Sequence, residues 1–113
     1  MKNTVILCTA FGMGRTNNQS LNMKLIVKYF DILLAGGSLP AAICFYTDGV
    51  KLTCAGSRAV HGLQLIQGMG VRLLICRTCL DEMGLTGRVR LGIVGGMPDI
   101  IDAQIKADKV ITI

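Results

Sequence analysis

The chain has 113 residues, a formal net charge of +5, and 51% hydrophobic residues, of which few are aromatic. This length is typical of one domain, so we predict a single domain over residues 1–113 with an aliphatic core. The basic residues form no run, which argues against nucleic acid as a partner. The longest uncharged run, residues 32–47, contains Gly and Pro and is shorter than the roughly 20 residues that a membrane-spanning helix needs.

Other bulk properties bear on compartment and assembly. The N-terminal residues lead directly into an apolar run without a signal-peptide cleavage pattern, so we expect a cytoplasmic protein. The five cysteines are an odd number outside any secreted framework, which predicts reduced thiols rather than a disulfide scaffold. Because this small chain is so apolar, we expect it to bury part of its surface in a homo-oligomer.

Apolar runs predict strands, and amphipathic segments between them predict helices. In chain order, we expect strands at 5–8, 41–46, 71–76, 89–93 and 110–113. The first expected helix, 21–34, has an apolar face of Leu21, Leu25, Tyr29 and Leu33, with Ile26 and Phe30 beside them. The second is capped by Ser57 and ends near 68. A short helix follows near 79–83, and the last begins at Pro98 and has Ile101 and Ile105, with Ile100 beside them, on its apolar side.

The alternation of strands and helices predicts an α/β fold with a mostly parallel five-stranded sheet and helices on both faces. Right-handed crossovers bring every strand-to-helix loop to the carboxyl edge of such a sheet, where open α/β folds bind ligands. The loops at 12–20, 47–56, 76–79 and 95–98 should therefore meet there.

A pair of thiols lies in the third of these loops, in the segment Cys76-Arg77-Thr78-Cys79-Leu80. Cys79 is expected at a helix start, where backbone N–H groups and the helix dipole stabilise a thiolate. We therefore predict that Cys79 is the reactive residue and that its pKa is depressed. Cys76 closes an apolar strand, which favours core packing, and a helper role in the chemistry is the alternative.

The remaining chemical groups carry weaker signals. Cys8 and Cys44 lie inside predicted strands and are assigned to the core, while Cys54 is a lesser candidate in a loop at the same edge. A metal site would need Cys54 and His61 to complete the single CxxC pair, so we predict neither a metal nor a cofactor. The loop at 12–14 lacks the GxGxxG pattern and is interpreted as a turn.

Two familiar arrangements are not supported. A thioredoxin-like CxxC would open the first βαβ unit, whereas this pair follows the third strand. A Ser/His/Asp triad is not apparent, because the only histidine lies in a predicted helix and Asp48 and Asp99 suit a turn and a helix start.

Several separate segments together resemble the DsrE/DsrF-like family over nearly the whole chain. The segments are Gly49-Val50-Lys51-Leu52 with Gly56-Ser57, Cys76-Arg77-Thr78-Cys79-Leu80 with Gly84-Leu85, Met97-Pro98-Asp99-Ile100, and Ala107-Asp108-Lys109-Val110-Ile111. The likeness is strongest to the DsrE-like domain of YedF-type proteins, which are associated with sulfur transfer and selenium metabolism.

This resemblance implies a three-layer α/β/α sandwich, assembly into homo-oligomers, and a loop cysteine that carries sulfur as a persulfide, matched here by Cys79. The family pattern has Gly where Arg77 stands. YedF-type proteins usually join this domain to a TusA-like domain with a Cys-Pro-x-Pro motif, which is not found here. The sulfur donor or acceptor is therefore expected to be a separate TusA-like or other sulfur-carrier protein.

The leading functional prediction is a sulfur-relay protein, with sulfurtransferase activity, that carries persulfide sulfur on Cys79. A non-catalytic module that binds a small anion or a protein at the same edge is the first alternative. A redox protein that forms a disulfide between Cys76 and Cys79 is the second.

Overall fold

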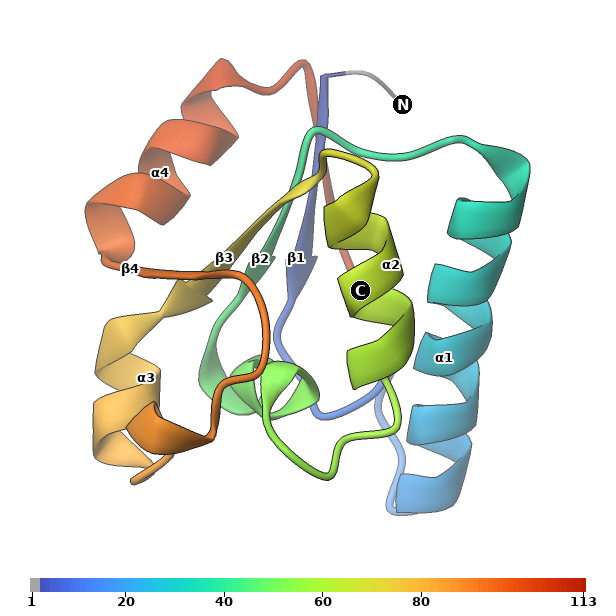
Figure 1. Cartoon of the computed structure of the whole chain (residues 1–113), viewed down its shortest axis with the longest axis vertical. Coiled ribbons are helices and arrows are strands. Elements are labelled where there is room, and N and C mark those ends of the chain that lie inside the picture. The colour runs from blue at the N-terminus through green and yellow to red at the C-terminus, as the bar shows by residue number, and fades with distance from the viewer. Residues whose placement is uncertain (1–2) are drawn as a thin grey trace.

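The computed structural model describes residues 3–113, so Met1 and Lys2 of the predicted domain lie outside the described residues. Five strands form one sheet in the order β4-β3-β2-β1-β5, and every neighbouring pair is parallel (Figure 1). The strands are β1 (Thr4–Cys8), β2 (Ala42–Phe45), β3 (Arg72–Cys76), β4 (Ile93–Gly95) and β5 (Lys109–Thr112).

Helices cover both faces of this sheet. α1 (Gln19–Gly36) and α2 (Val60–Gly68) lie side by side on one face. α4 (Met97–Lys106) lies on the other face, because the chain runs back across the sheet from β4 to β5 and the crossover stays right-handed. The predicted three-layer α/β/α sandwich is confirmed, and its sheet is entirely parallel.

Short helices occupy the carboxyl ends of the strands. These are α3 (Arg77–Glu82) and two 3-10 helices, η1 (Thr47–Thr53) and η2 (Thr86–Arg88). In Figure 1 the arrowheads of the strands point toward η1 and α3. This end of the molecule is therefore the carboxyl edge at which the sequence predicted the functional loops to meet.

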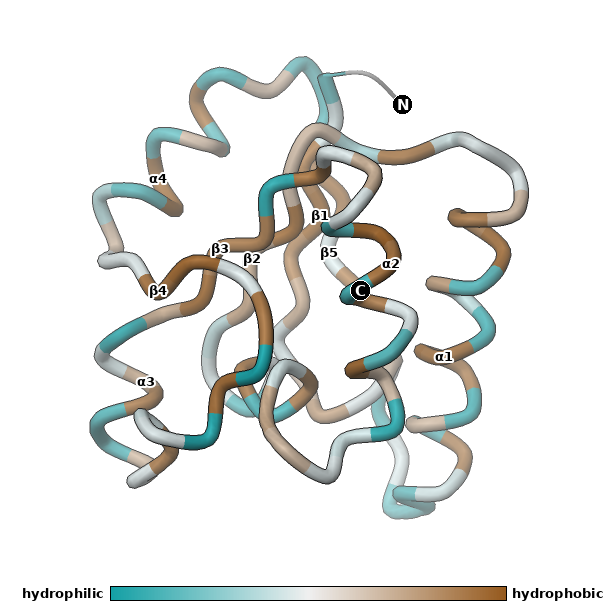
Figure 2. The backbone as a smooth tube through the Cα atoms, in the orientation of Figure 1, coloured by the Kyte–Doolittle hydropathy of each residue, from teal (hydrophilic) through white to brown (hydrophobic). Residues whose placement is uncertain are grey.

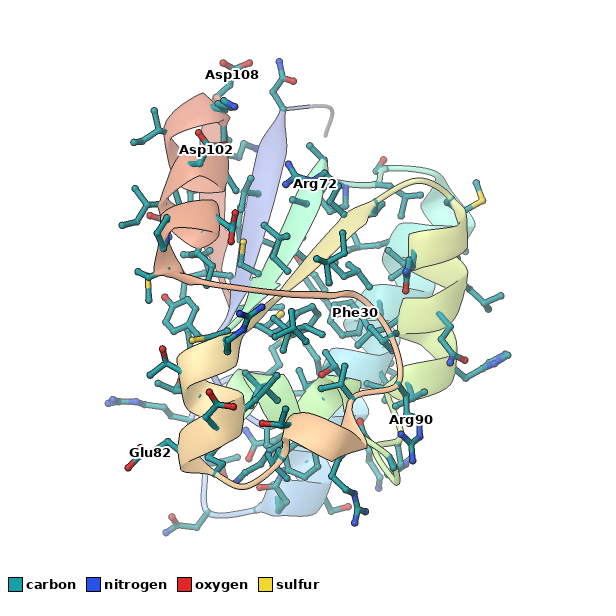
Figure 3. The ribbon with its side chains drawn as sticks, turned by 60° about the vertical axis from the view of Figure 1, so that its left-hand side comes forward. Phe30, Arg72, Glu82, Arg90, Asp102 and Asp108 are labelled. Carbon is teal, nitrogen blue, oxygen red and sulfur yellow. The ribbon has the colours of Figure 1, made fainter. Side chains whose placement is uncertain are left out.

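The core is aliphatic and centred on β1, β2 and β3. All residues of β1 and β2 are buried, and Figure 2 shows the hydrophobic part of the chain concentrated in these central strands. Phe30 of α1 is buried among the core side chains, whereas charged groups such as Glu82 and Asp102 point outward (Figure 3). The continuous apolar runs of the sequence are therefore strands covered on both faces.

The helix ends are defined by local hydrogen bonds. The Asn18 side-chain oxygen accepts the Leu21 N–H at 3.1 Å and caps α1. At α4, the Asp99 carboxylate accepts the Gly96 N–H at 2.9 Å, as its place at a helix start predicted. The predicted cap of α2 is wrong, because the Ser57 hydroxyl accepts the N–H of Ala59 in the turn before that helix.

The predicted apolar face of α1 is correct only in part, since Ile26 and Phe30 are buried as expected. Leu21 and Leu25 are exposed, and the buried face is formed by Asn22, Met23, Ile26 and Phe30. On this buried face the Asn22 side chain holds the preceding loop, donating to the carbonyl oxygens of Met13 and Gly14 at 2.9 Å.

The predicted stripe on α4 is correct only for Ile100. Ile101 and Ile105 are exposed, while Ile100 and Ala103 pack in the core. Helical spacing groups residues on one face but does not say which of two apolar faces meets the sheet.

The fourth strand lies later in the chain than the predicted 89–93. Val89 makes only an isolated antiparallel bridge with Cys54, and β4 begins at Ile93. Gly92 has a φ of 77° and lies so close to β3 that a Cβ there would be 2.9 Å from the Leu73 carbonyl oxygen. The chain thus crosses toward β3 before β4 pairs with β3.

Within residues 3–113, the helices are too short or too polar to cross a membrane.

Candidate functional site

Cys79 differs from the other cysteines in its exposure. It lies in α3 just after the end of β3 and is half-buried, whereas Cys8, Cys44, Cys54 and Cys76 are buried. All five thiols are free. A reagent or a partner protein in solution therefore meets Cys79 first.

The Cys79 sulfur is bound by a residue that follows a different strand. The backbone N–H of Thr47, just beyond β2, donates to Cys79 Sγ at 3.1 Å. The Thr47 hydroxyl lies 2.7 Å from the carbonyl oxygen of Thr9, which follows β1. The ends of three neighbouring strands are thus linked through Thr47 to one sulfur atom.

The pKa of Cys79 is raised from its ordinary value, so the predicted depression is wrong. Burial is the main cause, and a hydrogen bond to the Cys76 side chain acts in the same direction. The N–H groups of Thr47 and of Cys79 itself favour the thiolate but do not outweigh these effects. The helix-start expectation omitted the loss of water around the sulfur and the adjacent thiol, both of which depend on tertiary structure.

Cys76 packs in the core and also contacts Cys79. It is the last residue of β3, precedes the first residue of α3, and has only 2% of its surface exposed. The sequence prediction that it packs in the core is consistent with this burial. Its hydrogen bond with Cys79 gives this buried thiol an influence on Cys79 that adds to the effect of burial.

The other cysteines lie in packed environments. Cys54 is buried and its thiol donates to the Val50 carbonyl oxygen at 3.4 Å. Cys8 and Cys44 are buried in β1 and β2, and burial raises the pKa of both thiols, that of Cys44 to about 11. These positions agree with the core roles assigned to Cys8 and Cys44.

Arg77 stands where the family pattern has Gly, but its φ angle is not positive, so its backbone does not need a glycine. It is the first residue of α3, is exposed, and donates from Nη2 to the Val94 carbonyl oxygen at 3.3 Å. Among residues 3–113, the only non-glycine residue with positive φ is Thr47, at 49°. The unusual backbone conformation of this site is therefore on the Thr47 side of the sulfur.

A polar cavity lies beside the site at the carboxyl end of β1. Its volume is about 660 Å³, and Arg15, Asp48 and Lys51 contribute its charged lining. A second cavity of about 400 Å³ shares Arg15 and Asp48 and reaches Ile113, which follows β5. Since β1 lies between β2 and β5, these cavities are where the strand order reverses, the usual ligand position in open parallel sheets.

The loop at 12–14 forms part of the cavity wall. Gly12 and Gly14 have φ values of 143° and 79°, which agrees with the predicted turn. On the opposite side, the Asp48 carboxylate and Lys51 ammonium form an ion pair at 3.0 Å.

His61 and Asp99 lie in helices, as their predicted positions indicated. His61 is exposed on α2, and Asp99 takes part in the start of α4. Within residues 3–113, no three His, Cys, Asp or Glu side chains are grouped so that they could hold a metal ion.

Two residues of the site region were missed by the sequence reasoning. Thr47 lies at the start of the expected loop at 47–56 but has no predicted role, because no residue pattern predicts a positive φ at threonine. Asn22 interrupts the apolar pattern of α1, and that interruption was the available signal for its buried loop-holding role.

The parallel sheet with helices on both faces defines an α/β protein, and it has a free, half-buried thiol at its carboxyl edge. A family model described as the DsrE/DsrF-like family matches residues 1–113, and the chain therefore belongs to this family.

Solved structures with the same fold come from bacteria and an archaeon. The ychN protein from E. coli has a TM-score of 0.73 and 19% identity, and the match covers 100% of both chains. MTH1491 from Methanobacterium thermoautotrophicum, described as a protein of unknown function, has a TM-score of 0.69 and 18% identity over 97% of both chains. At these identities the likeness shows the fold. A comparison with curated protein sequences gave no significant match.

Proposed function

We propose that this protein is a sulfur-relay protein that carries persulfide sulfur on Cys79. The observation that carries the proposal is the half-buried Cys79 thiol at the carboxyl edge, with the Thr47 N–H at 3.1 Å from its sulfur. Membership in the DsrE/DsrF-like family, which is linked to sulfur relay, supports it.

The transfer is a thiol exchange that needs no external oxidant. Cys79 loses its proton to solvent, and its thiolate attacks the outer sulfur of a donor persulfide. A bond forms between Cys79 Sγ and that outer sulfur, while the donor's S–S bond breaks and its electron pair leaves on the donor thiolate. An acceptor thiolate then attacks the outer sulfur on Cys79 and restores the Cys79 thiolate.

The raised pKa of Cys79 gives the resting protein a protonated thiol at neutral pH. Such a thiol resists unwanted oxidation, because the thiolate is the reactive form. The Thr47 N–H stabilises the anion when it forms, as an N–H donor does for any developing negative charge.

The donor and acceptor are separate proteins in this scheme. A TusA-like or other sulfur carrier fits, as in the YedF-type arrangement that the sequence resembles. Self-association is a further part of the proposal, because α4 exposes Met97, Ile101 and Ile105 along its outer side. Sedimentation velocity of the intact protein measures whether it self-associates.

Sulfur loading tests the proposal directly. The protein is incubated with a cysteine desulfurase and cysteine, and its intact mass is then measured. Sulfur relay predicts a gain of one sulfur atom on the wild type and on Cys54→Ala, and none on Cys79→Ser. No gain on the wild type, or an equal gain on Cys79→Ser, would overturn it.

A second candidate function is the binding of a small anion without catalysis. The polar cavity with Arg15 at the reversal of the strand order favours it. A folded wild-type protein that takes up no sulfur and whose Cys79 is inert to alkylation would support this function instead.

A further inference from the structure

Thr47 has a backbone conformation that threonine rarely adopts. Its φ is 49°, in the left-handed region, where the branched Cβ of threonine is crowded by its own backbone. Thr47 is also exposed, so burial of its side chain does not impose the conformation. Such outliers persist only where neighbouring groups hold them.

Contacts of the Thr47 side chain help to keep the residue in this conformation. Its Oγ1 lies 2.7 Å from the carbonyl oxygen of Thr9, and at the same distance from that of Tyr46. The Thr9 contact joins the turn after β2 to the end of β1. The close approach of Gly49 to the Cys8 carbonyl group holds the same turn from its other end.

The consequence of this conformation is the direction of one N–H group. With Thr47 at positive φ, its N–H donates to Cys79 Sγ at 3.1 Å. A hydrogen bond to the charged form of an acceptor is stronger than one to its neutral form. A donor fixed in this direction therefore favours an anionic sulfur at Cys79 over a neutral one.

We infer that Thr47 is a positioning residue for Cys79, whose hydroxyl anchors the strained turn to β1 so that its backbone N–H stabilises the Cys79 sulfur anion. The role in sulfur transfer rests on the proposed function, whereas the effect on the Cys79 thiolate does not. The two can therefore fail separately.

The test is the pH dependence of Cys79 alkylation by iodoacetamide in the folded protein, followed by peptide mapping. Thr47→Val keeps the branched shape but removes the hydroxyl, and Thr47→Ala removes it with less crowding. Each should raise the pKa of Cys79 and lower its alkylation rate near neutral pH about tenfold, the size expected when one hydrogen bond to a charged group is lost.

Two variants serve as matched controls. Thr47→Ser retains the hydroxyl and should react within about twofold of the wild type. Thr47→Gly adopts a positive φ without an anchor and should also keep most of the reactivity. Circular dichroism spectra identify any variant that has not folded, and if Thr47→Val fails to fold, Thr47→Ala still decides the matter.

Wild-type alkylation profiles for folded Thr47→Val or Thr47→Ala would overturn the inference. So would a Thr47→Ser variant as slow as Thr47→Ala, or a Thr47→Gly variant as slow as Thr47→Val. If the profiles shift as expected while the wild type takes up no sulfur, the positioning role stands and the proposed sulfur relay fails.

Discussion

At the scale of single residues, the two thiols of the CxxC segment have different environments. Cys76 is enclosed by the core, and Cys79 is half-buried at its edge. The Cys76 side chain raises the pKa of Cys79 by hydrogen bonding to it and by charge repulsion. The pair therefore suits one carrier thiol with a buried neighbour that restrains its ionisation.

Removing the Cys76 thiol should make Cys79 more reactive. In Cys76→Ala the hydrogen bond and the charge repulsion are lost, so the pKa of Cys79 falls and more thiolate is present near neutral pH. We expect a severalfold faster alkylation of Cys79 by iodoacetamide, measured by peptide mapping.

The matched control is Cys54→Ala, which removes a buried thiol that bonds to Val50 instead. This variant should alkylate at the wild-type rate. A slower reaction of Cys79 in Cys76→Ala would show that Cys76 supports the thiolate.

At the scale of elements, η1 packs the loop after β2 against the end of β1. Its Gly49 is buried and packs directly on the backbone of Cys8. A Cβ at Gly49 would overlap the Cys8 carbonyl oxygen, which itself accepts the Tyr46 N–H at 3.1 Å. Only glycine allows this approach, and Thr47 is placed beside Cys79 as a result.

Gly49→Ala should therefore be strongly destabilising. Backbone atoms cannot move aside as a flexible side chain can, so we expect a loss of about 2–4 kcal/mol in the free energy of unfolding. Urea unfolding followed by circular dichroism measures it.

Gly68→Ala is the matched substitution in open space at the end of α2, where no atom lies within 4 Å of the new Cβ. It should be neutral or stabilising by up to about 1 kcal/mol. Equal effects of the two substitutions would contradict the close approach of η1 to β1.

The elements were predictable where the signal is local. Continuous apolar runs identified β1 and β2, and a run interrupted only by Arg72 identified β3, because strands buried on both faces need apolar residues along most of their length. Position 89 was misassigned because an apolar residue in a crossing segment resembles one in a strand. The buried faces of α1 and α4 were predictable only in part, because each helix has apolar residues on two sides.

The sequence predicted the location of Cys79, but it did not predict the direction of its pKa shift or the residue that donates to its sulfur. The end of an apolar strand followed by a second cysteine located Cys79 at the carboxyl edge. The direction of its pKa shift depends on burial and on the Cys76 contact, which arise only when the chain is folded. Thr47 donates to a sulfur 32 positions away, and no sequence spacing encodes that contact.

At the scale of the whole molecule, the buried thiols make the free energy of unfolding depend on pH. The pKa of Cys44 is raised from 9.0 to about 11, chiefly by burial, and that of Cys8 is raised as well. Above the ordinary thiol pKa the unfolded chain loses these protons while the folded chain keeps them. The folded state then binds more protons, so stability is full below about pH 8 and falls as pH rises toward about 11.

Removing one of these thiols should flatten that dependence. For Cys44 alone the loss of unfolding free energy between about pH 8 and pH 10 is of order 1 kcal/mol. Cys44→Ala should lower stability at every pH and show a correspondingly smaller decline, measured by urea unfolding across this range.

Ile43→Val is the matched variant, since it trims a buried side chain of the same strand that carries no proton. It should decline as steeply as the wild type. A decline in Cys44→Ala as steep as that of the wild type would show that this thiol does not titrate differently on unfolding.

The central claim is that one thiol, Cys79, carries the sulfur, and the most direct measurement is the location of that sulfur after a single loading. The loaded protein is alkylated to trap persulfides, digested, and mapped by mass spectrometry, before and after a chase with an acceptor thiol. We predict that the extra sulfur is found on the Cys79 peptide before the chase and is lost from it afterwards. Sulfur on the Cys8, Cys44, Cys54 or Cys76 peptides instead, or on none, would contradict the claim.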